Sequence, residues 1–206
     1  MKISLGLMFT VFSLMAGASA QAGLQEGASA YYRGHFSVAL KELVPLAENG
    51  DAKAQAILGQ MYSSGSGVTQ DNVKAAFWYR KAAEQGHVRA QTSLGTMYKE
   101  GIGVPQDEKE AASWLHRAAE QGYGEALYTL GGMYERGQGS IPVDLVQAHK
   151  LFNIAVAAGF DIANDDLQEI EVKMSREQIE TARDMAKEWL ATHTLPTHNG
   201  RLRHGP

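Results

Sequence analysis

Cysteine is absent from this 206-residue sequence, and its absence excludes several chemistries at once. The chain has no thiol nucleophile, no cysteine-ligated zinc and no cysteine that a lipid could modify. A protein of this size does not need disulfides when its core is large enough. Basic residues give no excess either, because 19 Lys and Arg stand against 23 Asp and Glu, for a formal net charge of −4. Without a basic surplus to neutralise phosphates, nucleic acid is not an expected partner.

Long apolar runs are missing except at the start of the chain. There, Met1-Lys2 is followed by an uncharged apolar run over residues 3–16 and by the small residues Ala18-Ser19-Ala20. This order is typical of a cleavable signal peptide, and the run is too short to span a bilayer comfortably. We predict cleavage after Ala20 and a mature protein, without a membrane span, in the periplasm or secreted. A buried N-terminal helix is the alternative interpretation.

Motifs that carry enzyme chemistry are also missing. The sequence contains no HExxH pair, no Gly-x-Ser-x-Gly elbow and no Ser-x-x-Lys. Its Gly-x-Gly pairs lack the preceding strand and the following lysine of a phosphate-binding loop. His193, His198 and His204 near the C-terminus have two interpretations, a weak metal chelator and a solvated tail, and we favour the solvated tail. We therefore predict no catalytic residue, no cofactor and no metal.

An internal repeat dominates what the sequence does contain. Ala54, Ala90 and Ala126 are separated by 90 − 54 = 36 and 126 − 90 = 36 residues, and many other positions keep this step. Each copy contains Leu-Gly-x-Met-Tyr, followed by Gly-x-Gly, Asp and Ala. An aromatic residue or leucine, an Ala-Ala or Ala-Val pair and a final glycine complete the copy. The third copy carries one extra residue near Ser140.

Each copy reads as two helices. In the first, Ala54, Leu58, Met61 and Tyr62 recur at spacings of three and four, which is one stripe of a helical surface. The second helix is expected to begin at an N-capping aspartate and to end at a glycine in the left-handed conformation. These residues are Asp71, Asp107 and Asp144, with Glu110 and Gln147 as reach-back partners, and Gly86, Gly122 and Gly159.

Glycine inside the first helix of each copy indicates a repeated steric demand. Gly59, Gly95 and Gly131 each occur where alanine would favour the helix by about 1 kcal/mol. We expect the backbones to approach closely at these glycines, with Tyr62 and Trp78 filling the groove beside them. A single pair cannot bury its apolar stripe alone, so neighbouring pairs must stack.

This pattern resembles the Sel-one-like repeat, a relative of the tetratricopeptide repeat. The resemblance implies an all-α, right-handed α-solenoid of antiparallel helix pairs. The expected segments are a signal peptide at 1–20, a tetratricopeptide-like hairpin at 21–50, repeats at 51–86, 87–122 and 123–159, capping helices at 160–193, which include a capping box formed by Ser175 and Gln178, and a disordered tail at 194–206.

The resemblance also implies a function. Proteins of this kind bind a protein or peptide partner on the concave face formed by the first helix of each pair, and we expect an adaptor or scaffold of the cell envelope. The predicted partner-binding residues are Lys53, Gln60, Arg89, Thr96, Lys99, Glu100, Tyr128, Glu135 and Arg136. They differ from copy to copy, which fits either a binding face or freely solvated helices. The alternative function is a cell-wall or β-lactam hydrolase, as claimed for cysteine-rich relatives, although this chain lacks their disulfides.

Overall fold

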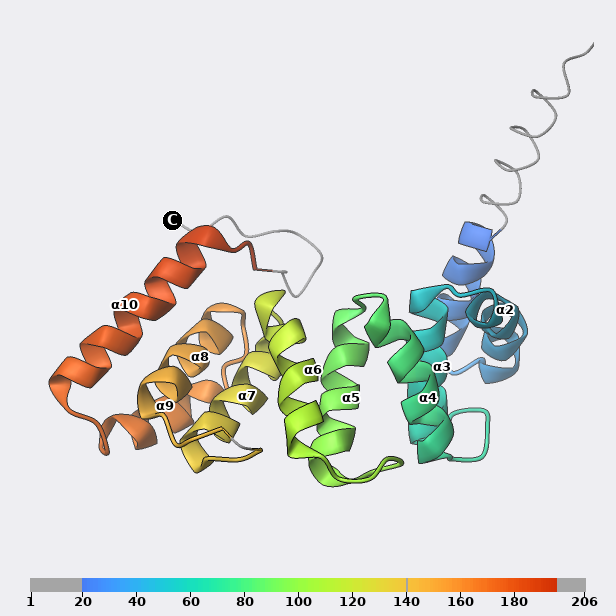
Figure 1. The fold of residues 1–206 in the computed structure, drawn as a ribbon. Helices are drawn as coiled ribbons and strands as arrows, with labels where there is room; N and C mark the ends of the chain where they lie inside the picture. The colour runs from blue at the N-terminus through green and yellow to red at the C-terminus, as the bar shows by residue number, and fades with distance from the viewer. Residues whose placement is uncertain (1–19, 140, 196–206) are drawn as a thin grey trace, which may run out of the picture. The chain divides into compact units, whose positions relative to one another are not determined.

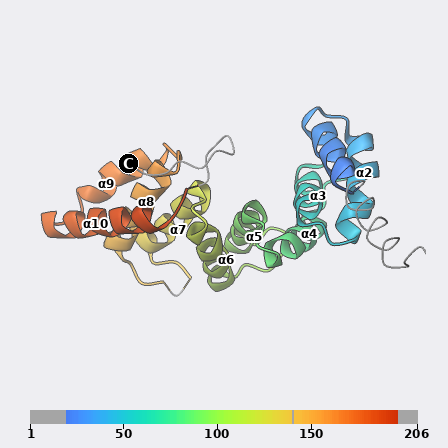
Figure 2. The same cartoon turned by 90° about the horizontal axis from the view of Figure 1, so that it is seen from above.

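The structure is a computed structural model that describes residues 20–139 and 141–195 (Figures 1 and 2). The predicted signal peptide lies outside these residues except for Ala20, and so does the predicted disordered tail except for Thr194 and Leu195. The chain divides into two compact units, one ending at His87 and the other beginning at Val88, and each is described by itself.

The first unit contains two helix pairs. Its helices cover residues 20–32, α2 (Phe36–Glu48), α3 (Ala52–Ser64) and α4 (Asn72–Glu84). Leu24, Leu43 and Leu58 belong to one buried cluster that joins these helices. The contact between residues 20–32 and α2 is tight, because a Cβ atom at Gly27 would lie 2.7 Å from Cγ of Leu43.

The second unit continues the alternation and ends in two further helices. Its helices are α5 (Val88–Glu100), α6 (Glu108–Glu120), α7 (Gly124–Arg136), α8 (Leu145–Ala157), α9 (Ala163–Glu171) and α10 (Arg176–Thr192). Each of α5 to α8 contacts the next helix along the chain, and α10 packs along α8 (Figure 1). The described residues thus confirm the predicted all-α class built from antiparallel helix pairs. Among them, no helix combines the length and apolar character needed to cross a membrane.

The glycine inside each first helix makes room for a side chain of the second helix. A Cβ atom at Gly59 would lie 2.6 Å from Cδ1 of Tyr79. The expectation that Tyr62 and Trp78 occupy this space is therefore wrong, because Tyr79, one residue after Trp78, fills it. One residue along a helix turns a side chain by about 100°, so the two neighbours serve different contacts.

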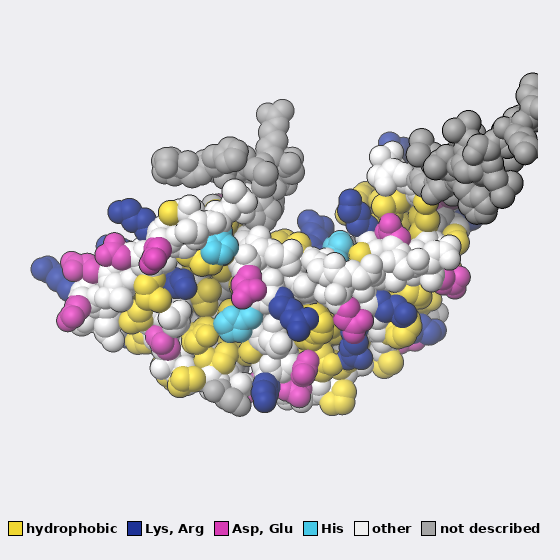
Figure 3. All heavy atoms as spheres, turned by 45° about the horizontal axis from the view of Figure 1, so that its top comes forward, with side chains coloured by type: hydrophobic (Ala, Val, Ile, Leu, Met, Phe, Trp, Pro, Cys, Tyr) yellow, Lys and Arg dark blue, Asp and Glu magenta, His cyan; other side chains and the backbone are white. Residues whose placement is uncertain are grey.

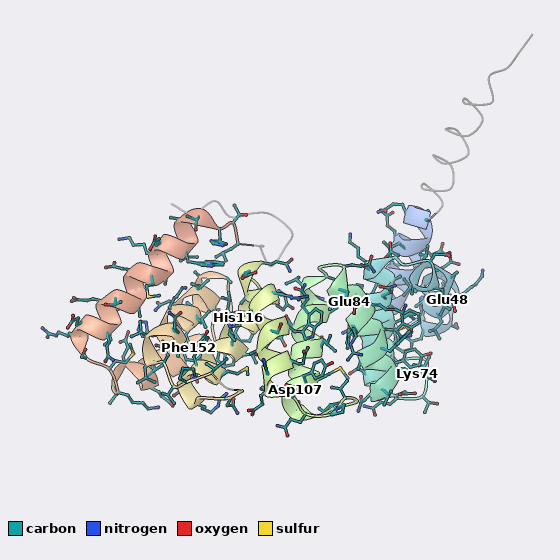
Figure 4. All side chains as sticks on the ribbon, in the orientation of Figure 1. Glu48, Lys74, Glu84, Asp107, His116 and Phe152 are labelled. Carbon is teal, nitrogen blue, oxygen red and sulfur yellow. The ribbon has the colours of Figure 1, made fainter. Side chains whose placement is uncertain are left out.

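The same arrangement recurs in the second unit. A Cβ atom at Gly131 would lie 2.7 Å from Cε1 of Phe152, a side chain that is fully buried in α8 (Figure 4). A Cβ atom at Gly95 would lie 2.8 Å from Cγ of Leu115. The steric demand inferred from the repeated glycine is real, and the residue that imposes it is Tyr, Leu or Phe in the three copies.

The Gly-x-Gly loop at residues 137–139 turns the chain and also packs on the preceding second helix, α6. Gly137 and Gly139 have φ values of 68° and 69°, in the left-handed region that favours glycine. Gly139 donates its N–H to the Glu108 carboxylate at 2.8 Å, and a Cβ atom there would lie 2.6 Å from the Glu108 carbonyl oxygen. Both backbone conformation and close approach therefore require glycine at this position.

The capping aspartates are confirmed, but the predicted reach-back by Glu110 and Gln147 is wrong, because the backbone N–H groups of Asp107 and Asp144 donate to the carbonyls of Tyr98 and Tyr134 at 2.9 Å. The carboxylates of Asp71, Asp107 and Asp144 accept backbone N–H groups three residues on, at 2.9 to 3.0 Å. Ser175 and Gln178 form the predicted capping box at the start of α10, with each side chain bonded to the other's backbone. These contacts stabilise the first turns and fix where each second helix begins.

Two pairs of glutamines join first and second helices inside the repeats. Gln85 donates to Gln55 at 2.7 Å, and Gln121 donates to Gln91 at 2.8 Å. Gln55 and Gln91 are buried, at 3% and 4% exposure, so each pair satisfies polar atoms that water does not reach. The sequence analysis did not anticipate these pairs.

A buried histidine connects the last three helices. His149 of α8 has no exposed surface, and its Nδ1 accepts a 2.8 Å hydrogen bond from the Asn153 amide. Its Nε2 therefore carries the proton and donates to Glu171 of α9 at 2.8 Å. Arg183 of α10 donates to the same carboxylate oxygen at 2.8 Å. These hydrogen bonds lower the pKa of Glu171, the bond from His149 being the largest cause.

Candidate functional site

The predicted partner-binding residues are divided between the two units. Lys53 and Gln60 are exposed on α3 in the first unit. The other seven belong to α5 and α7 of the second unit.

The α5 residues are largely engaged with their neighbours. Arg89 hydrogen-bonds the Tyr123 hydroxyl, although burial, the larger effect, raises the pKa of that phenol. Lys99 lies 3.8 Å from Glu100, and Thr96 is half-buried. The α5 side chains thus contribute one local ion pair and one arginine that is already hydrogen-bonded.

Tyr128 of α7 is an aromatic side chain held in place on three sides. Its ring centroid lies 5.2 Å from that of Phe160 and 5.7 Å from that of Phe152. Burial first, and then the nearby Asp166 carboxylate of α9, raises the pKa of the Tyr128 phenol. The ring is half-buried with its polar end at the surface.

Charged side chains surround this tyrosine. Glu135 accepts a 2.9 Å hydrogen bond from Lys173, which raises the pKa of that lysine, and lies 4.0 Å from Arg136. The Arg136 side chain lies over Gly132 and is exposed, with its Nε atom 3.4 Å from the Gln138 amide oxygen. In the view of Figure 3, acidic and basic side chains are interspersed over the described surface.

Tyr128, Glu135, Arg136, Asp166 and Lys173 together form what we call the α7–α9 patch. The structure brings three predicted residues together and adds Asp166 and Lys173, which the sequence analysis missed. A signal for them exists, because 166 − 128 = 38 and 173 − 135 = 38, close to the period of the repeats. The 36-residue pattern had decayed by then, and the register was not carried into α9.

The patch combines side chains that suit contact with another protein. It offers an anchored aromatic ring, an exposed arginine and charges of both signs on α7, on α9 and in the turn after α9. Within residues 20–139 and 141–195, no group of three His, Cys, Asp or Glu side chains is arranged to hold a metal ion. Stacked helix pairs with a repeated core and a variable outer face define a helical repeat protein.

The sequence family agrees with this class. Three consecutive segments, residues 52–87, 88–123 and 124–160, match the Sel1 repeat. These segments make up more than half of the chain, which therefore belongs to the Sel1 repeat family. Membership fits a protein-interaction role.

Two solved structures resemble the chain at informative levels. A Sel1 repeat protein from Oxalobacter formigenes is 42% identical with a TM-score of 0.57, over 63% of this chain and 97% of that one. A protective antigen present in uropathogenic Escherichia coli strains, which displays an SLR fold, is 31% identical with a TM-score of 0.72, over 83% of this chain. This chain spans only 38% of the length of the antigen. Comparison with curated protein sequences finds no match.

Proposed function

We propose that this protein is an adaptor that binds a protein or peptide partner through the α7–α9 patch. The observation that carries the proposal is the fixed position of Tyr128, whose ring packs on Phe160 and Phe152. Aromatic and arginine side chains supply much of the binding energy at protein interfaces. Because the Tyr128 ring is already ordered, its side chain would lose little conformational entropy when a partner binds.

The mixed charges of the patch favour a polar partner surface. Glu135 and Lys173 already neutralise each other, whereas Arg136 has a long 4.0 Å contact with Glu135 and a 3.4 Å hydrogen bond to the neutral Gln138 amide. Arg136 is therefore the side chain best placed to pair with a carboxylate of the partner. We expect the partner to present an acidic group next to an apolar one that contacts Tyr128.

We also propose that the protein works in the cell envelope, in the periplasm or after secretion. This rests on the sequence of residues 1–20, with its basic start, apolar run and Ala18-Ser19-Ala20. Cleavage after Ala20 would leave the helical residues 21–32 joined to α2, with Leu24 still buried. The intact mass of the protein recovered from a periplasmic fraction tests this, because a mature chain begins at Gln21.

The test of the adaptor function is affinity capture from envelope extract with residues 21–206, followed by mass spectrometry. The patch variant is Tyr128→Ala with Arg136→Ala. The matched control is Lys109→Ala with Lys187→Ala, two exposed positions on α6 and α10. Circular dichroism and thermal unfolding verify that all three proteins are folded.

The expected result is a partner that is captured by the wild type and by the control variant but lost with the patch variant. A partner retained by the patch variant would move the binding site to another face. Turnover of a chromogenic β-lactam or of labelled peptidoglycan would contradict the adaptor proposal and favour the hydrolase.

A further inference from the structure

A pocket opens in the second unit, and none of its lining residues belongs to the α7–α9 patch. It has a volume of about 210 Å³ and lies where α6, α7, α8 and α10 meet. Its lining residues are His116, Ala119 and Glu120 of α6, Leu127, Leu130 and Tyr134 of α7, Gln147, Lys150, Leu151 and Ile154 of α8, and Trp189 of α10.

The bottom of the pocket is apolar and rigid. Leu127, Leu130 and Ile154 are buried, at 1%, 1% and 0% exposure, as parts of the main core of this unit. Trp189 supplies an aromatic wall, and its ring is stacked on that of His193 at 4.0 Å between centroids. The wall comes from α10, which lies outside the repeats, so the pocket is not a feature that the repeat itself produces.

The rim of the pocket is polar. Figure 4 shows His116 on α6, and its Nε2 atom lies 3.4 Å from the Tyr134 hydroxyl. Burial, the largest cause, lowers the pKa of His116, while Glu120 acts in the opposite direction and Lys150 in the same one. The imidazole is therefore neutral at pH 7, and the charges at the rim are those of Glu120 and Lys150.

Glu120 and Lys150 carry charges of opposite sign and are not paired with other charged side chains of the described residues. Among the described residues, neither forms an ion pair within 4.0 Å, although both act electrostatically on the same His116 ring. The position of Lys150 is occupied by Phe77 and Ser113 in the other two copies. A lysine here is thus no requirement of the repeat.

The size and charges of the pocket narrow its ligand. Pockets for drug-sized ligands run from about 300 to 1,000 Å³, so this one takes a smaller molecule with a single apolar group. The rim offers one ammonium and one carboxylate, and a ligand gains most when it satisfies both. A ligand with a single charge would pair with either the ammonium or the carboxylate and would leave the other without a partner.

We propose that this pocket binds a small zwitterion with an apolar side chain, namely an apolar α-amino acid. The side chain lies against Trp189 and Leu151, which is 8% exposed, above the buried Leu127, Leu130 and Ile154. The α-carboxylate pairs with Lys150, and the α-ammonium pairs with Glu120. The neutral His116 and the Tyr134 hydroxyl complete the polar side of the site. This site is separate from the α7–α9 patch and does not depend on the adaptor function.

The experiment titrates the purified protein with L-leucine by isothermal calorimetry and by intrinsic tryptophan fluorescence, to which Trp189 contributes together with Trp78 and Trp114. The matched ligands are N-acetyl-L-leucine, which lacks the ammonium, L-leucinamide, which lacks the carboxylate, and glycine, which lacks the side chain. We expect saturable binding of L-leucine and about tenfold weaker binding of each analogue, since a charge-assisted hydrogen bond is worth about 1.5 kcal/mol or more.

Variants assign each ligand group to its residue. Lys150→Met should no longer distinguish L-leucine from L-leucinamide, and Glu120→Gln should no longer distinguish L-leucine from N-acetyl-L-leucine. The controls, Lys109→Met and Glu180→Gln, change exposed residues outside the pocket and should bind like the wild type.

Three results would overturn the proposal. The first is the absence of binding to L-leucine, L-isoleucine, L-phenylalanine and L-methionine at millimolar concentration. The second is equal affinity for L-leucine and N-acetyl-L-leucine in the wild type, which would assign the site to the C-terminus of a peptide. The third is unchanged selectivity in both pocket variants. Loss of partner capture by the patch variant bears on none of these results.

Discussion

Two adjacent glycines of α7 provide a sharp test of how the repeats pack. A Cβ atom at Gly131 would lie 2.7 Å from Cε1 and 2.8 Å from Cδ1 of Phe152, a ring that is 1% exposed. A Cβ atom at Gly132 would lie 2.8 Å from Nη2 of Arg136, the far end of an exposed and flexible side chain. The ring has nowhere to move in a close-packed core, whereas the guanidinium can swing into water.

The same substitution should therefore have opposite effects at these two positions. Alanine in place of a helical glycine stabilises the helix by about 1 kcal/mol in both cases. At Gly131 this gain is outweighed, because forcing extra atoms into a packed core costs about 1 to 3 kcal/mol. We expect Gly132→Ala to raise the free energy of unfolding by up to about 1 kcal/mol. We expect Gly131→Ala to lower it by up to about 2 kcal/mol.

Thermal and urea unfolding of the two variants measure this difference. For a domain of this size, 1 kcal/mol shifts Tm by about 2 to 4 °C. Phe152→Val, tested alone and together with Gly131→Ala, provides the control. In that background the added methyl group should cost less, because the ring it meets is gone. Equal stability of Gly131→Ala and Gly132→Ala would refute the close contact between Gly131 and Phe152.

Three further predictions concern buried polar groups and helix ends. The lowered pKa of Glu171 means that its contribution to stability is present above the unfolded value near 4.5 and is lost as pH falls through the folded value. Glu171→Gln should flatten the pH dependence of Tm in that acidic range. Gln121→Ala should destabilise the protein by about 1 to 3 kcal/mol in urea unfolding, because it removes the amide that donates to the buried Oε1 atom of Gln91 at 2.8 Å. Adding Gln91→Leu should restore much of that loss. A double variant that is less stable than Gln121→Ala alone would contradict this prediction. Asp144→Ala should cost about 1 kcal/mol through the lost N-cap of α8, and unchanged urea unfolding would contradict it.

The repeat made much of the fold predictable from the sequence. Period, helix pairs, capping aspartates and terminal glycines all follow from local rules that act within one copy. Three copies also reinforce one another, so that Gly59 stands out only because Gly95 and Gly131 recur with it. The internal symmetry therefore supplied information that a single copy does not contain.

Contacts between non-equivalent elements were not predictable in the same way. The spacing of Gly59 indicated a bulky neighbour, but Trp78 and Tyr79 are adjacent aromatic residues, and sequence pattern alone did not tell which of them faces the glycine. The pocket wall at Trp189 depends on α10 packing along α8, which no repeat equivalent foreshadows. Likewise, Asp166 meets Tyr128 only because α9 continues the row of first helices after the pattern has decayed.

The three copies also show which changes the stacking tolerates. Gln55 and Gln91 pair with Gln85 and Gln121, whereas the third copy has Leu127 and an alanine, Ala158, at the corresponding positions. Both members change together, because one buried glutamine without the other would leave an unsatisfied amide. Copy-to-copy variation in the interior is thus explained by pairs that match each other.

The same reasoning applies to the patch and separates two causes of its variation. Lys99 and Glu135 occupy one position in successive first helices, since 135 − 99 = 36. Lys173, 173 − 135 = 38 residues further on, lies in the turn just after α9 and pairs with Glu135 at 2.9 Å. Neighbouring helices must match each other in charge, so alternation along this row does not by itself indicate a partner. Exchanging the charges, with Glu135→Lys and Lys173→Glu together, keeps the ion pair and reverses its direction. We expect Glu135→Lys alone to lower Tm by placing like charges side by side, and the exchanged pair to recover it. A partner that reads the patch should be lost with the exchanged pair although the fold is intact. A partner captured equally by the exchanged pair and the wild type would show that these two charges serve only the helices, leaving Tyr128 and Arg136 to carry recognition.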